Sequence, residues 1–130
     1  MEYGVWLSRF FLALIFLLNG LGVIDQARGA QELAGHGVPM SLVPLLMIGG
    51  RILQVVAGVA LLLGVRERLA ALALAAFLIP ATLAAHDFWA YRGPELQAQL
   101  VNFSKNVAML GGLLLVVFRP DHEDRTPASS

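Results

Sequence analysis

The 130-residue sequence contains no cysteine and has few charged residues. The missing cysteines exclude disulfides, thiolate metal sites, iron–sulfur ligation and a thiol-based redox relay. Only 14% of the residues are charged, against about 25% in an ordinary soluble domain, whereas 58% are hydrophobic. The nine basic and nine acidic residues cancel, and no basic patch or stripe offers nucleic acid a binding surface. The composition therefore indicates one membrane domain and no nucleic-acid partner.

Four apolar segments are long enough to cross a bilayer, which takes roughly 20 helical residues. Pro44 favours a helix start in the second segment and Pro94 in the fourth. The first segment is too long for the apolar region of a signal peptide, and three more follow it, so we interpret it as a membrane anchor. The expected helices cover residues 4–24, 42–65, 68–86 and 94–118.

These segments predict an all-α fold, an integral membrane four-helix bundle that occupies residues 1–119 as a single domain. Residues 120–130 are polar, and we expect them to form a disordered cytoplasmic tail.

Arginine is unevenly distributed between the two sides of the membrane. Four spans place both termini and the turn between the second and third helices on one side. The arginines expected on that side are Arg9, Arg66, Arg68, Arg119 and Arg125. The opposite loops, residues 25–40 and 87–93, hold only Arg28 and Arg92. Since basic residues accumulate on the cytoplasmic side, we expect both termini to be cytoplasmic.

Each expected helix carries a polar residue at a similar depth. At about 1.5 Å per residue, Asn19, Arg51, His86 and Lys105 all lie roughly 20–25 Å from the cytoplasmic ends of their helices. Charged groups at this depth are costly when they face lipid, so these side chains are expected to point inward. Helical spacing adds neighbours to the layer, and the resulting set of candidate ligand-binding residues is Lys105, Arg51, His86, Asn102, Asn106 and Gln54.

Two cations in one layer need an anionic or strongly accepting partner, such as a carboxylate, a phosphate or a quinone oxygen. The alternative is that Arg51 and Lys105 extend to lipid phosphates, or pair with Asp87 and Asp25 to orient the loops. No second histidine within the spans faces His86 at a useful depth, so haem is not expected. Pro80 is expected to bend the third helix beneath His86.

Four stretches carry a family resemblance. They are residues 9–20 (RFFLALIFLLNG), 57–68 (AGVALLLGVRER), 84–86 (AAH) and 102–115 (NFSKNVAMLGGLLL). The last is the most specific, because a lysine between asparagines above a double glycine is not generic membrane sequence. On these stretches the chain resembles the DoxX family of small four-helix membrane proteins. In that resemblance Lys105, Asn106 and His86 fall at polar positions of the family pattern, whereas Arg51 stands near a position that usually holds an acid.

The resemblance implies a multi-pass protein of the bacterial inner membrane. Named members of the family look like subunits of quinone-linked sulfur oxidation or partners in oxidative-stress complexes, and many are labelled oxidoreductases. Distant relatives include cargo receptors and receptor-assembly chaperones.

The sequence thus predicts a quinone- or lipid-binding accessory subunit of a membrane redox system. The chain has no redox cofactor motif, so electrons would come from other membrane or redox subunits. The alternatives are a non-enzymatic assembly scaffold and, with less support, a small-molecule transporter, which four helices would form only as a homo-oligomer.

Overall fold

The computed structural model describes residues 2–24 and 27–119 of the chain. Within these ranges the regular structure is entirely helical, in the order α1 (Glu2–Gly20), α2 (Ala27–Gly35), α3 (Val43–Leu63), α4 (Glu67–Ala85), the 3-10 helix η1 (Phe88–Ala90) and α5 (Pro94–Val117). Four of these helices, α1, α3, α4 and α5, are long and apolar enough to cross a membrane. The predicted class, an all-α membrane bundle with four spans, is confirmed.

The observed helices differ from the predicted ranges mainly at the loops. Helix α1 ends at Gly20 rather than at residue 24, because Gly22 adopts a positive φ of 82° and reverses the chain. Two short helices, α2 and η1, stand where only loops were expected. Helix α4 continues through Pro80 to Ala85. The expected tail, residues 120–130, lies outside the described residues.

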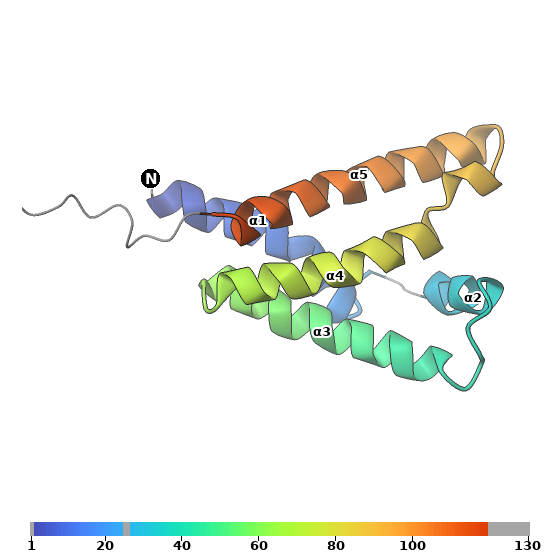
Figure 1. The fold of residues 1–130 in the computed structure, drawn as a ribbon, viewed down its shortest axis with the longest axis horizontal. Helices are drawn as coiled ribbons and strands as arrows, with labels where there is room; N and C mark the ends of the chain where they lie inside the picture. The colour runs from blue at the N-terminus through green and yellow to red at the C-terminus, as the bar shows by residue number, and fades with distance from the viewer. Residues whose placement is uncertain (1, 25–26, 120–130) are drawn as a thin grey trace, which may run out of the picture.

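The four long helices form a ring in the order α1, α3, α4, α5 (Figure 1). The backbones of diagonal pairs are not in close contact, and α1 approaches α5 only briefly, with Leu12 beside Gly112. One end of the bundle, here called the terminal end, holds the start of α1, the α3–α4 turn and the end of α5. The opposite end, the loop end, holds α2 and η1, and toward it α3 and α5 diverge.

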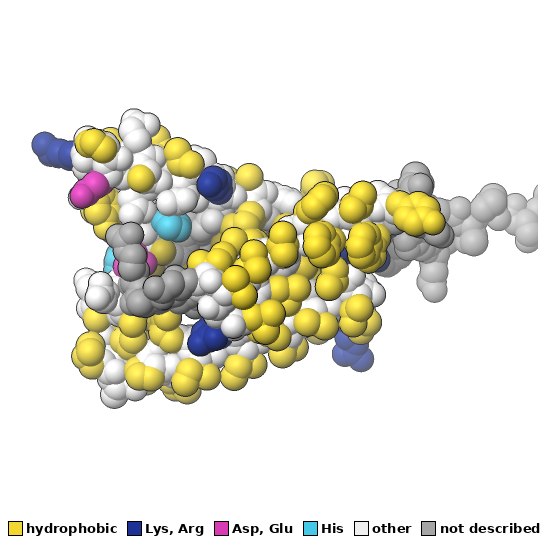
Figure 2. Space-filling view, turned by 180° about the vertical axis from the view of Figure 1, so that it is seen from behind, with side chains coloured by type: hydrophobic (Ala, Val, Ile, Leu, Met, Phe, Trp, Pro, Cys, Tyr) yellow, Lys and Arg dark blue, Asp and Glu magenta, His cyan; other side chains and the backbone are white. Residues whose placement is uncertain are grey.

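The core of the bundle is apolar and built from small and large residues in alternation. Phe16, Leu61, Leu74 and Leu113 are fully buried, with several alanines packed between them. Hydrophobic side chains also dominate the outer face (Figure 2). Since lipid tails are as apolar as leucine, close packing rather than exclusion from water must hold these helices together.

Gly20 on α1 lies in close contact with the middle of α3. A Cβ atom at Gly20 would lie 2.6 Å from Val55 Cγ2 and 2.9 Å from the carbonyl oxygen of Arg51. No side chain fits there without separating the helices, so glycine sets the α1–α3 distance.

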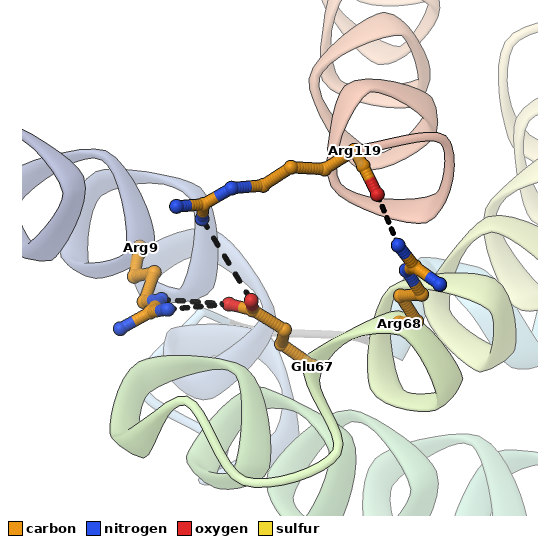
Figure 3. Close-up of polar contacts among 4 residues, drawn as sticks. All are labelled: Arg9, Glu67, Arg68 and Arg119. Atoms are coloured by element: carbon orange, nitrogen blue, oxygen red, sulfur yellow. Dashed lines mark hydrogen bonds and ion pairs between the residues drawn. The ribbon is translucent and has the colours of Figure 1, made fainter. Parts of the chain in front are cut away.

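At the terminal end, an ion cluster joins the helices around Glu67 (Figure 3). The Nε and Nη2 atoms of Arg9 lie 2.8 and 2.7 Å from Glu67 Oε2, and Arg119 Nη1 lies 3.7 Å from Oε1. Arg68 donates a hydrogen bond to the carbonyl oxygen of Arg119. The Arg9 guanidinium also packs against Gly64, where a Cβ atom would lie 2.8 Å from its Nη1 atom. Residues from α1, α4 and α5 and from the end of α3 thus converge on one carboxylate.

A tight turn places Glu67 at this point. Gly64 caps α3 in the left-handed region, with φ 72°, and Arg66 precedes α4 with φ 46°. A positive φ is unfavourable for arginine, and it persists here because the turn must bring the first residue of α4 to Arg9.

We expect Gly20→Ala to destabilise the bundle by about 1–3 kcal/mol, because the added methyl group collides with backbone atoms of α3. Gly49→Ala is the matched control, since nothing lies within 4 Å of a Cβ atom there. Unfolding in mixed micelles with increasing denaturing detergent measures both. Equal stability of the two variants would contradict the close approach.

We expect Glu67→Gln to destabilise the protein by about 2 kcal/mol, because it leaves Arg9 and Arg119 without their carboxylate at a partly buried site. Glu95→Gln removes an exposed acid from the first turn of α5 and should cost about 0.3–1 kcal/mol. The same unfolding assay compares them. A Glu67→Gln variant as stable as the parent would show that the cluster contributes nothing.

Candidate functional site

Two hydrogen bonds join α4 to α5 in the loop-end half of the bundle. His86 Nδ1 lies 2.9 Å from Gln99 Oε1, and Asn106 Nδ2 donates to Thr82 Oγ1 at 3.0 Å. Thr82 is buried and the other three residues are half-buried. The structure therefore brings the predicted residues His86 and Asn106 together along one seam between two helices, which we call the α4–α5 seam.

Aromatic contacts join η1 to α5 at the loop end of this seam. The Phe88 ring in η1 meets the Phe103 ring on α5 edge to face, with centroids 5.0 Å apart, and Trp89 packs against both. Edge-to-face pairs of this kind are worth about 0.5–1.5 kcal/mol beyond their buried area. They fix the first turns of α5, and with them Asn102, which is half-buried.

Lys105 lies on α5 next to the seam, and its side chain is exposed. Within the described residues it forms no hydrogen bond and no ion pair. Side chains on a helix tilt toward its N-terminus, which for α5 is the loop end. Lys105 thus lies midway along a membrane-spanning helix, with its Cα–Cβ bond tilted toward the loop end.

Arg51 contacts the C-terminal end of α1. Its Nε atom donates to the carbonyl oxygen of Gly20 at 3.2 Å, and a Cβ atom at Gly22 would lie 2.6 Å from its Nη2 atom. The last carbonyls of a helix lack partners within it, and a cation near them is favourable. Arg51 is thus occupied, at least in part, by the α1–α3 contact.

The side chains of Arg51 and Lys105 are exposed, and the backbones of their helices, α3 and α5, are not in close contact. Neither residue is therefore buried within the bundle. The shared pocket and the binding role of each residue stay predictions.

Gln54 points into the core, unlike Arg51 one turn earlier. It is 2% exposed, and its Nε2 atom donates to the carbonyl oxygen of Gly50 at 3.2 Å. Its Oε1 atom is buried without a hydrogen-bond partner among the described residues. A buried amide oxygen in this state favours any donor that can reach it.

Sequence reasoning missed the contact between α2 and the end of α4. His36 Nε2 lies 3.4 Å from Asp87 Oδ2, and its Nδ1 lies 2.7 Å from the carbonyl oxygen of Glu32. That backbone contact, together with the nearby Asp87 carboxylate, raises the pKa of His36 above its ordinary value. In the sequence, Glu32 and His36 lie one helical turn apart, and this spacing could have indicated the contact between them.

A polar hollow of about 360 Å³ adjoins this contact. Gln31, Asp87 and Tyr91 are among the residues that line it. Across the described residues, no three His, Asp or Glu side chains gather closely enough to hold a metal ion. Among the described residues, Asp87 contacts His36, next to α2, and no ion pair joins it to Lys105.

The ring of helices is open on the side of α5 that faces α1. The backbones of the two helices approach each other only briefly, and Leu12 lies beside Gly112. Lys105 and the α4–α5 seam lie in the loop-end half of the bundle.

Comparisons with known proteins agree with the fold. The family model DoxX matches residues 4–87, which include α1, α3 and α4 but not α5. The chain is 27% identical over 111 residues to the inner membrane protein YphA of Escherichia coli, covering 85% of this chain and 78% of that one.

The inner membrane protein YqjF of the same organism is 29% identical over 116 residues, covering 88% and 82%. No solved structure matches the chain significantly. With four membrane-spanning helices and these relatives, the chain belongs to the DoxX family and is a multi-pass protein of the bacterial inner membrane.

Proposed function

We propose that this DoxX-family protein is an accessory subunit of a membrane redox system, and that it binds a quinone or a lipid beside Lys105. One observation carries the proposal. The Lys105 ammonium is exposed midway along a membrane-spanning helix and has no partner among the described residues. An ammonium group in or near hydrocarbon is costly unless an acceptor meets it. A quinone carbonyl or a lipid phosphate is the acceptor that the bilayer supplies.

The surroundings of Lys105 support a ligand with a polar head and an apolar body. Asn102 and Asn106 lie within one helical turn of it, and Asn106 is fixed by Thr82. Val101, one turn before Lys105 on the same face of the helix, is exposed and offers apolar contact. The ligand would therefore be held by one charge-assisted hydrogen bond and by dispersion contacts along α5.

His86 would act next to this ligand as a proton carrier. Its Nδ1 atom is engaged by Gln99, which fixes the ring and its tautomer. Proton exchange with a reduced or oxidised quinone would then involve the other ring nitrogen. In this role the chain binds, orients and exchanges a proton, while electrons come from a partner subunit.

The direction of the chain in the membrane is part of the proposal. The terminal end holds Arg9, Arg66, Arg68 and Arg119, and we propose that it faces the cytoplasm. The Lys105 site would then lie in the outer half of the bilayer.

A topology experiment tests this orientation. Alkaline phosphatase and green fluorescent protein, which are active only outside and only inside the inner membrane respectively, are fused after Ser130 or inserted in residues 25–40. We expect fluorescence from the C-terminal fusion and phosphatase activity from the loop insertion. The reverse pattern would overturn the orientation.

We expect Lys105→Met to weaken ligand retention by about tenfold or more, the cost of one charge-assisted hydrogen bond at 1.5–3 kcal/mol. The protein is extracted from its own membrane into polymer nanodiscs, and retained quinone and lipid are quantified by mass spectrometry. Met keeps the apolar stem of the side chain and removes only the ammonium group.

Two further variants control this experiment. Lys105→Arg should retain the ligand, and Arg92→Met, which removes an exposed cation between η1 and α5, should leave it unchanged. Loss of a quinone assigns the site to a quinone, and loss of a phospholipid alone assigns it to a lipid. A folded Lys105→Met protein that retains everything the parent retains would contradict the proposal and favour an assembly scaffold.

A further inference from the structure

We propose that the terminal end of α5 holds a second, separate site, which binds an anionic phospholipid of the inner leaflet. The headgroup phosphate meets Arg119, and the first part of an acyl chain lies in a hollow along the last turns of the helix. This site is at the opposite end of α5 from the Lys105 site. It does not depend on the proposed redox function, but its place in the inner leaflet rests on the proposed orientation of the chain.

The hollow is apolar along its length and basic at one edge. It has a volume of about 480 Å³ and is lined by Gly111, Leu114, Leu115, Phe118 and Arg119. From Gly111 to Phe118 the helix rises roughly 10 Å, enough for the upper half of an acyl chain. Leu115 and Phe118 are 77% and 78% exposed, so this wall of the hollow faces the bilayer.

Gly111 creates the depth of the hollow. Nothing lies within 4 Å of a Cβ atom at this position, so the missing side chain leaves open space rather than relieving a helix contact. Gly112, one residue later, is different, because a Cβ atom there would already lie 3.4 Å from Leu12. The pair of glycines thus serves two purposes: Gly112 lets α1 approach, and Gly111 opens the lipid-facing side.

The charge at this end selects an anionic headgroup. Among its described residues, the terminal end carries four arginines (Arg9, Arg66, Arg68 and Arg119) and two acids, Glu2 and Glu67. Arg68 reaches the carbonyl oxygen of Arg119, which brings a second guanidinium to the edge of the hollow. A guanidinium carries five N–H donors in a fork, so Arg119 can contact Glu67 and a phosphate together.

Native mass spectrometry of the purified, delipidated protein tests the site. The full chain is titrated with phosphatidylglycerol and, separately, with phosphatidylcholine of the same acyl chains. We expect a preference for phosphatidylglycerol that Arg119→Gln reduces about fivefold, the equivalent of ~1 kcal/mol for one arginine at a membrane surface. Gly111→Leu fills the hollow and should abolish the most tightly held lipid of either kind.

Matched variants decide the result. Gly49→Leu adds the same side chain at an open position on α3, and Arg92→Gln removes an exposed arginine at the loop end. Both should bind as the parent does. Unchanged binding by Gly111→Leu, or an equal loss in Arg92→Gln and Arg119→Gln, would overturn the site. If Arg119→Gln fails to fold, Gly111→Leu against Gly49→Leu still decides it.

Discussion

The carboxylate of Glu67 is the contact on which the arrangement of the bundle depends. Apolar helices in lipid gain little from burying apolar surface, so specific polar contacts and close backbone approach determine how they associate. Glu67 pairs with Arg9 of α1 and with Arg119, just beyond the end of α5, next to the glycine that ends α3. The terminal end is therefore closed around one charge, and this accounts for the strained turn at Arg66.

The loop end is organised by weaker and more local contacts, which leave the bundle open on one side. Arg51 binds the end of α1, His36 ties α2 to Asp87, and the α4–α5 seam holds its two helices together. None of these contacts joins α1 to α5, so lipid has access to Lys105 there. A bundle closed at one end and open at the other suits a protein that holds a bilayer-soluble ligand without enclosing it.

The sequence was sufficient to locate the helices but not to determine which helices pack against one another. Long apolar runs and Pro94 predicted four spans, since hydropathy and length decide membrane crossing. Both His86 and Asn106, predicted as site residues, contact the neighbouring helix along the α4–α5 seam. Orientation around each helix was harder, because lipid-facing and core-facing positions are equally apolar and leave no periodicity to read. The sequence therefore did not show that the side chains of Lys105 and Arg51 are exposed.

Contacts between segments that are distant in the chain could not be predicted from the sequence either. Gln99 as the partner of His86, and Glu67 as the partner of Arg9, depend on which helices are adjacent. The short helix α2 was not predicted because it is too short and too polar to span a membrane. Its position is determined by its packing against α3 and α4.

Lys105 is the only lysine in the chain, so ¹⁵N NMR of protein labelled at the lysine side-chain nitrogen reports on that one ammonium group directly. Spectra are recorded in nanodiscs of zwitterionic lipid, with and without added quinone or anionic lipid. The account predicts that one of the two ligands shifts the Lys105 signal, and that Gly111→Leu does not prevent the shift. A signal that neither ligand changes, while bound ligand is detected in the same sample, would contradict a binding site at Lys105.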